Sequence, residues 1–527
     1  MGGGVVSTLQ TEAGISRTRR RWTIAICCMS VSLVVASMAT LYTALAEIAV
    51  ATGATQIQLT WVIDGYTLAL ACLVLPAGAI GDRYGRRKVM LIGLGVFSAA
   101  SCVPLVLTDP GWLIAARAVA GVGAALVMPS TLSIMTAEFP ESKNQGVALW
   151  AAVAGTSAAL GILAAGAIMS VMSWQFIFVG FAGIGLVLFA AGFALPESYD
   201  PAHAKIDVHG AIWAAVTVGA LVWATIEAPL RGWLDPLVLV LFAVAAGSAA
   251  IFVMVERRAD HPLLQLQLFT NRSFGSGAVS VTLQFFLILG IYILVVQFLQ
   301  LILGYDPLPS AYALVPMFAP VILAAFPAVW LAEKLGLRTV FLVGFLAIGA
   351  GLLVISRLDL SSGYVDVLWP FLIVSVGTGL VAAPGTLAIV DNTPMAKQGV
   401  AAAVNDVTRE VGAALGIALS GSLLAAGYSA QLTPMLPNLP EPVRGPVSDS
   451  LAAALAVTDR LGPAAQPLAD IARSAFLHGF SQAATVMAWA SLAAAVILGI
   501  WAPGPTRRDT GTAIGASETS ASKISAG

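Results

Sequence analysis

The stretch "GAIGDRYGRRKVM", Gly78–Met90, lies between two long apolar runs and is the most specific motif in the sequence. Small residues at Gly78, Gly81 and Gly85 let two helix ends approach closely in a tight turn. Asp82 can cap or pair with a helix terminus. Basic residues hold such a segment in the cytoplasm, and four of them occur here: Arg83, Arg86, Arg87 and Lys88. A cytoplasmic loop that only orients the protein in the membrane would explain the positive charge. Such a loop does not require the full spacing G-x-x-x-D-R-x-G-R-R-K, which is much more specific.

Composition identifies the class of protein around this stretch. The chain has 527 residues, of which 58% are hydrophobic and 10% charged, against roughly 45–50% and 25% in soluble domains. Apolar runs of ~20 residues recur along it, and each is long enough to cross a bilayer. The sequence therefore predicts an all-α polytopic membrane protein. Its net charge of −1 says nothing about acidic or basic partners, and no nucleic-acid partner is expected.

Fourteen spans are predicted from hydropathy. They cover residues 24–46, 60–80, 88–107, 112–134, 146–168, 174–195, 210–230, 236–255, 275–297, 310–332, 339–356, 367–389, 399–424 and 477–500. About 19 of the 26 Lys and Arg residues fall on the side of the N-terminus and about five on the other. By the positive-inside rule, both termini are predicted to be cytoplasmic.

The spans divide the chain into predicted units. These are a cytoplasmic tail (1–23), a six-helix bundle (24–195), two linker helices with their loops (196–274), a second six-helix bundle (275–500) and a disordered cytoplasmic tail (501–527). The cytoplasmic stretch 256–274 is expected to contain an interfacial helix. The long outer loop, about 429–475, is expected to form a short helical hairpin.

The 78–90 stretch resembles the signature loop of the major facilitator superfamily, in which it latches the two halves of the transporter at the cytoplasmic side. "RAVAGVGAALVMP" in the fourth span resembles the superfamily's intramembrane arginine motif, and the resemblance implies that Arg117 takes part in proton handling. The alternative for Arg117 is a side chain that reaches the outer interface. The implied fold is two six-helix bundles plus two linker helices, with alternating access to a site at the midplane.

Further stretches resemble the fourteen-helix drug:proton antiporters of this superfamily, the EmrB/QacA type. They include "WVIDGYTLALA", "KIDVHGAIW", "FLQLILGYDPLPSAYALVP" and "GVAAAVNDVTREVGAALGIALSG", and the resemblance covers roughly residues 22–500. It implies that Asp64 helps to recognise cations, and the family often has an acid at the position of Glu227. For both residues, a solvated position at the outer edge of the membrane is the alternative.

The chain departs from this family at three positions. Ser37 stands where family members have an Asp in the first span, and Ile162 stands where the fifth-span motif has a Pro. Gln175 stands where they often have an Arg. The first departure removes a carboxylate, and the second leaves the direction of transport open.

Three charges lie in the thirteenth span, in "VNDVTREVG" (residues 404–412). Measured from Gly399, Asp406 lies ~10 Å and Glu410 ~16 Å along a helix, which puts Glu410 near the midplane. Arg409 is three residues from Asp406 and can pair with it. This pair would leave Glu410 to bind a proton. The candidate carboxylates for proton coupling or substrate binding are Asp64, Asp406 and Glu410, with Arg117 and Arg409 as their modulators. The alternative is a static polar cluster that holds helices together.

The sequence thus predicts a transporter, not an enzyme, that exports amphiphilic, often cationic, compounds and acts as a monomer in the bacterial inner membrane. It needs no cofactor or metal, because the proton gradient supplies the energy. The aromatic residues that could line its cavity are Trp61, Tyr66, Trp150, Phe285, Phe286 and Tyr292. The rivals are a carrier, in either direction, for one lipid, siderophore or metabolite, and a non-transporting receptor or scaffold.

Overall fold

The computed structural model describes residues 17–54, 56–138, 143–199, 207–260 and 262–505, and the regular structure in these residues is helical. The α-helices are α1 (Arg17–Thr52), α2 (Gln56–Tyr84), α3 (Arg86–Cys102), α4 (Pro110–Glu138), α5 (Lys143–Met169), α6 (Gln175–Gly192), α7 (Val208–Arg231), α8 (Pro236–Arg258), α9 (Arg272–Gln297), α10 (Pro307–Leu314), α11 (Phe318–Ile355), α12 (Tyr364–Asp391), α13 (Gln398–Leu432), α14 (Glu441–Asp449), α15 (Leu451–Leu461) and α16 (Gln466–Trp501). The predicted all-α class is confirmed.

Thirteen helical stretches in the described residues are long and apolar enough to cross a membrane. One of them, Leu308–Ile355, has 48 residues, or about 70 Å of helix, which is twice the thickness of the hydrocarbon layer. It is broken at Gly336, where φ is 81° and ψ is 158°. The stretch therefore makes two crossings, and the total agrees with the predicted fourteen.

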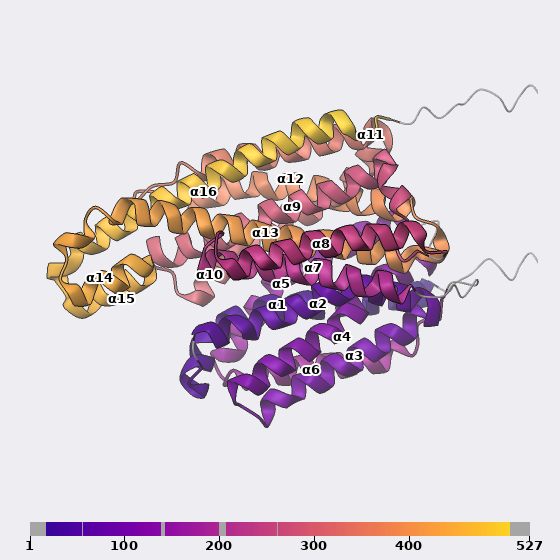
Figure 1. Ribbon diagram of the computed structural model, residues 1–527, viewed down its shortest axis with the longest axis horizontal. Helices are drawn as coiled ribbons and strands as arrows, with labels where there is room; N and C mark the ends of the chain where they lie inside the picture. The colour runs from indigo at the N-terminus through magenta and orange to yellow at the C-terminus, as the bar shows by residue number, and fades with distance from the viewer. Residues whose placement is uncertain (1–16, 55, 139–142, 200–206, 261, 506–527) are drawn as a thin grey trace, which may run out of the picture.

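The helices form two bundles with a pair of helices at their junction (Figure 1). The first bundle, indigo to magenta, contains α1 to α6, and the second, pink to yellow, contains α9 to α13 and α16. The linker helices α7 and α8 pack on each other, and α7 also contacts α2 and α13, one helix from each bundle. The apolar core of the first bundle continues into α9, α12 and α13, so the bundles share a buried apolar interface.

Helices α13 and α16 extend beyond the rest of the molecule and carry α14 and α15 at their ends, at the left of Figure 1. Ser450 separates the two short helices, and its side chain accepts a hydrogen bond from the amide of Ala453 at the start of α15. The Tyr428 hydroxyl on α13 donates to the carbonyl of Val447 on α14 at 3.0 Å. The structure thus contains a helical pair within the predicted outer loop.

One sequence expectation about the loops is wrong. Between α8 and α9, the described residues of the 256–274 stretch form a short 3-10 helix, Leu266–Thr270, in place of an interfacial helix. The Glu256 carboxylate accepts a hydrogen bond from the amide of Leu264 and folds the chain back on α8. Helix α1 begins at Arg17, inside the predicted tail, because the arginines there are good helix formers. Residues 1–16 and 506–527 lie outside the described part of the chain.

The turn at Gly85 has a counterpart at Gly336. Gly85 separates α2 from α3 with φ 110° and ψ 123°, and Gly336 divides α11 in a similar conformation, which residues other than glycine rarely adopt. Two residues after each glycine, an arginine donates to a carbonyl that follows the last helix of its bundle. Arg87 donates to Leu195 at 3.0 Å and Arg338 to Ala502 at 3.2 Å. Both bundles thus have the same arrangement of a glycine turn and an arginine at the same end of the molecule.

Candidate functional site

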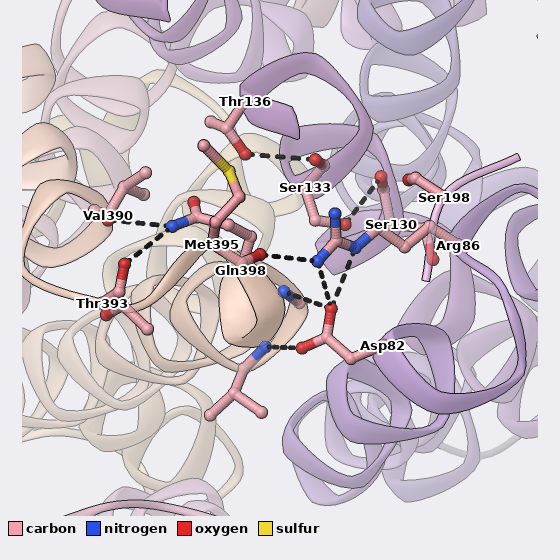
Figure 2. Close-up of polar contacts among 12 residues, drawn as sticks. Asp82, Arg86, Ser130, Ser133, Thr136, Ser198, Val390, Thr393, Met395 and Gln398 are labelled. Carbon is pink, nitrogen blue, oxygen red and sulfur yellow. Dashed lines mark hydrogen bonds and ion pairs between the residues drawn. The ribbon is translucent and has the colours of Figure 1, made fainter. Parts of the chain in front are cut away.

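The 78–90 stretch joins the bundles through Asp82, at the last turn of α2. Its Oδ1 accepts hydrogen bonds from Nε and Nη2 of Arg86, at 2.9 and 2.7 Å. The backbone amides of Gly399 and Val400 donate to the same carboxylate at 2.9 and 3.1 Å (Figure 2). These amides belong to the first turn of α13, whose free N–H groups and dipole favour an anion. Asp82 therefore caps a helix of the opposite bundle.

Close backbone approach accompanies this cap. A Cβ atom on Gly78 would meet the carbonyl oxygen of Gly399, and one on Gly399 would meet Gly78 and Asp82. Arg86 also donates to the carbonyl of Met395 at 3.2 Å, across the bundle interface (Figure 2). We call this end of the molecule the loop end. At the loop end, the structure holds the two bundles in contact.

The start of α13 is itself fixed by its own bundle. Gln398 uses its Nε2 to donate to the carbonyl of Val390, in the last turn of α12, at 3.2 Å and to that of Thr393, just beyond the helix, at 3.0 Å (Figure 2). Lys397 donates to the carbonyl of Pro262 at 3.1 Å, in the loop after α8. The amides that bind Asp82 are thus presented by a rigid segment.

Other residues of the stretch hold it to its own bundle. Arg87 lies 3.6 Å from Glu197, and a Cβ atom on Gly85 would meet the Glu197 carboxylate. Arg83 lies over the ring of Tyr84, with its guanidinium carbon 5.3 Å from the ring centroid. Asp82 and Arg86 therefore make the contacts across the interface, while Arg87 anchors the turn.

Arg117 lies inside the first bundle, not at the membrane interface, and is 1% exposed. It donates to the carbonyls of Val62 and Ser37, at 3.2 and 3.1 Å. Its guanidinium carbon lies 4.1 Å from the centroid of the Tyr66 ring. Within the described residues, Arg117 thus satisfies its charge with carbonyls and an aromatic face, and joins α4 to α1 and α2. The interfacial alternative for this residue is wrong.

A cavity of about 270 Å³ lies between the bundles, and we call it the acidic compartment. Its wall includes Asp64 from α2, Glu410 and Arg409 from α13, and Thr225 from the linker helix α7. Glu410 is 6% exposed, and its Oε2 has no hydrogen-bond partner in the structure. Counted along their helices from the loop end, Glu410 lies about 18 Å deep and Asp64 about 30 Å. The compartment therefore has one carboxylate at mid-depth and one towards the opposite end.

A second cavity of about 100 Å³ adjoins the first, and we call it the neutral compartment. Its wall is mostly apolar, with Arg409 as its only charged residue. The two compartments share five wall residues: Gly155, Ala158, Phe285, Leu289 and Arg409. Polar side chains in the neutral compartment include Gln284, Tyr292, Ser375 and Thr378.

The three charges of α13 occupy different surroundings. Asp406 is fully buried outside the walls of both compartments, with its Oδ1 4.0 Å from Nη1 of Arg409. The Arg409 guanidinium carbon lies 4.5 Å from the ring centroid of Phe285 and 5.1 Å from that of Trp150. Aromatic faces thus supply much of the stabilisation of Arg409. Only Arg409 and Glu410 reach the cavity.

Glu227, near the end of α7, accepts a hydrogen bond from Nε of Arg231 at 2.6 Å. Its neighbour Ile226 lines the acidic compartment. Glu227 thus lies beside the cavity, where an exposed arginine partly neutralises it.

Sequence reasoning missed Gln284 and Gly155. Of the six aromatic residues named from the sequence, Phe285 and Tyr292 line the neutral compartment, while Trp150 lies over Arg409 and Tyr66 under Arg117. Trp61 packs edge-on against Trp223 of α7. The signal for Gln284 was available, because an amide in an apolar span is costly unless it is paired. Among the described residues, no group of three or more His, Cys, Asp and Glu could hold a metal ion.

Comparison with known proteins gives relatives over most of the chain. The family model described as Major Facilitator Superfamily matches residues 27–417. The multidrug efflux pump LfrA of Mycolicibacterium smegmatis is 31% identical over 444 residues, which cover 84% of this chain and 88% of the pump. The methyl viologen resistance protein SmvA of Salmonella typhimurium is 29% identical over 496 residues, or 92% of this chain and 98% of that protein.

The fold is also similar to solved structures. The human organic anion transporter MFSD10 aligns with a TM-score of 0.59 at 12% identity, covering 91% of this chain and 99% of that one. At this level of identity, the similarity concerns the fold alone.

Proposed function

Since the chain belongs to the Major Facilitator Superfamily, we propose that it is a secondary transporter that exports amphiphilic, often cationic, toxic compounds. The names of its relatives support this, because LfrA is a multidrug efflux pump and SmvA a methyl viologen resistance protein. Methyl viologen is a flat dication, and the acidic compartment offers two carboxylates to such a molecule. The transporter acts as a monomer in a bacterial inner membrane, with both termini in the cytoplasm.

Alternating access follows from the contacts at the loop end. With the predicted orientation, this end faces the cytoplasm, so the structure represents a state closed on that side. To admit a compound from the cytoplasm, the bundles must separate there, and the amides of Gly399 and Val400 must leave Asp82. Arg86 remains as a partner for the Asp82 carboxylate in the open state, since both belong to the first bundle. The contact between Asp82 and α13 can therefore break without leaving the Asp82 carboxylate unpaired.

The strongest support for proton coupling comes from Glu410. Its Oε2 is buried and unpartnered beside the acidic compartment, and an uncompensated carboxylate in such a place is costly. Either a proton or a cationic compound can compensate it, but not both at once. Because the proton and the cationic compound compete for Glu410, binding of one releases the other. The neighbouring charges of Arg409 and Asp406 modulate the affinity of Glu410 for both. Asp64 serves as a second carboxylate for the cation, and Glu227 adds negative charge behind it.

Inside-out vesicles with an imposed pH gradient test this proposal. We expect the wild-type protein to accumulate a cationic dye and to release protons as it does so. Glu410→Gln keeps the shape of the side chain and removes its charge, so dye-driven proton release should vanish. Asp64→Asn should weaken dye uptake but leave residual exchange. Glu441→Gln, on the exposed start of α14, is the matched control. Full dye-driven proton release by Glu410→Gln would refute the role given to this residue.

A second candidate is a carrier for one specific metabolite, lipid or siderophore. It is favoured by Ser37 and Ile162, which replace an acid and a proline of the antiporter pattern. Ser37 is fully buried and donates to the carbonyl of Val34 at 2.9 Å. The first span therefore lacks a carboxylate at this point. A panel of unrelated cations in the same vesicles separates the two candidates, because a specific carrier would move none of them.

A further inference from the structure

The two compartments of the central cavity differ in chemistry. The acidic compartment contains Asp64 and Glu410. The neutral compartment has no acid in its wall, and its aromatic side chains are Phe285, Phe318, Phe371 and Tyr292. Flat aromatic faces suit a flat apolar ligand. A cation is favoured in the first compartment and a planar uncharged group in the second.

One face of α9 supplies two polar side chains of the neutral compartment, Gln284 and Tyr292. The residues of α9 that line it follow a helical stripe: 281, 284, 285, 288, 289 and 292. Gln284 is 3% exposed, and its Oε1 has no hydrogen-bond partner. The hydroxyl of Tyr292 is also buried without a partner, about 12 Å further along the helix. Buried polar atoms are normally paired, so these two are available to a ligand.

Gly155 lies where the two compartments meet. It lines both, and a Cβ atom built on it would have no neighbour within 4 Å. The passage between the compartments is therefore open at this glycine. Ala158, three residues along the same helix face, widens the same passage with another small side chain.

Arg409 places a positive charge at the passage between the two compartments. Its side chain lines both compartments and is held by the rings of Phe285 and Trp150. A positive charge at the junction repels a cationic group from the neutral compartment, where no carboxylate in the wall offsets it. A ligand with one charged end therefore has only one favourable orientation.

We propose that the central cavity is a two-part binding site for elongated cationic amphiphiles whose flat apolar body carries a hydrogen-bond donor. The cationic group lies in the acidic compartment at Glu410 and Asp64. The body passes Gly155 and stacks on the aromatic rings, and its donor binds Oε1 of Gln284. Gln284 is thus a specificity-determining residue. This inference rests on the proposed export of cationic compounds and names the part of the cavity that selects among them.

A matched pair of ligands tests the role of Gln284. Ethidium carries two aromatic amino groups, and its desamino analogue has the same ring system and charge without them. Binding to the purified protein in nanodiscs is measured by competition with radiolabelled tetraphenylphosphonium, a compact cation without hydrogen-bond donors. We expect the wild-type protein to bind ethidium about three to ten times more tightly than the desamino analogue, the effect of one hydrogen bond. Gln284→Met should reduce this ratio to about one and leave tetraphenylphosphonium binding unchanged.

Two further variants complete the design. Gln297→Met, on the same helix but outside both compartments, should keep the wild-type ratio. Gly155→Leu narrows the passage, so it should weaken ethidium binding at least tenfold. The loss for tetraphenylphosphonium should be smaller, because this cation does not extend into the neutral compartment. An unchanged ethidium ratio in Gln284→Met, with tetraphenylphosphonium binding intact, overturns the two-part site alone. Absence of any cation binding to the wild-type protein overturns both this inference and the proposed function.

Discussion

The Oδ1 atom of Asp82 lies 2.9 Å from the backbone nitrogen of Gly399, although 317 positions separate the two residues in the chain. A side chain in the last turn of α2 thus caps the start of α13 in the opposite bundle. The Asp82 carboxylate also pairs with Arg86, so the contact combines a buried ion pair with the dipole of α13.

Asp82→Asn should favour the state that is open at the loop end. The variant keeps the size of the side chain but loses charge-assisted hydrogen bonds, so the closed state should lose about 1.5–3 kcal/mol. Spin labels at Tyr84→Cys and Met395→Cys, exposed side chains of the two bundles, should report longer distances in a protein without its native cysteines. Lys88→Gln, on an exposed side chain of the same stretch, should leave the distances unchanged. Equal distances in Asp82→Asn and the wild-type protein contradict the latch.

Gly399→Val should also prevent the bundles from closing at the loop end, here through a steric clash. The valine side chain would be forced against Gly78 and Asp82. We expect the protein to remain folded but open at the loop end, with export rates reduced at least tenfold. Gly421→Val on the same helix is the control, because a Cβ atom there has no neighbour within 4 Å. The same spin-label distances and a dye-export assay measure the effect. Wild-type export by Gly399→Val would show that the close approach of the glycines is dispensable.

Hydropathy was sufficient to predict the membrane fold, because each crossing needs its own apolar run. It even separated the two crossings that meet at Gly336. The packing of Arg117 could not be read in the same way, since its partners are backbone carbonyls of other helices. Likewise, the sequence shows Gln284 and Tyr292 in an apolar helix but not whether they face lipid, protein or a cavity. The sequence also does not distinguish the surroundings of Asp406 from those of Glu410. The packing of the helices determines that Glu410, and not Asp406, reaches the acidic compartment.

Gly336→Ala should lower thermal stability more than Gly462→Ala. Both glycines have positive φ, 81° and 75°, where a side chain costs about 1–3 kcal/mol of strain. At Gly336 the new methyl group would also meet the backbone of Gly504 and Pro505, whereas at Gly462 it would meet nothing within 4 Å. Melting curves of the purified variants, followed by size-exclusion chromatography, measure the difference. Equal losses would mean that the chain after α16 does not pack at Gly336 in solution.

Cysteine labelling tests the predicted orientation. In a protein without its native cysteines at 27, 28, 72 and 102, Asp109→Cys should react with an impermeant maleimide on intact cells. Lys88→Cys should react only after the membrane is permeabilised. Both side chains are exposed; Lys88 lies in the first turn of α3 and Asp109 in the loop beyond its other end. The reverse pattern would place the loop end outside the cell.

The paired turns at Gly85 and Gly336 give each bundle an acid three positions before the glycine, at the same end of the molecule. In the first bundle, the acid three positions before the glycine is Asp82, 5% exposed and shared between four donors. In the second bundle, the equivalent Glu333 is exposed and accepts one hydrogen bond from Asn144, near the start of α5, at 2.6 Å. Equivalent positions of the two bundles thus make a buried, fourfold contact in one case and a single exposed hydrogen bond in the other. When the bundles separate at the loop end, the two sides of the interface therefore resist opening to different degrees.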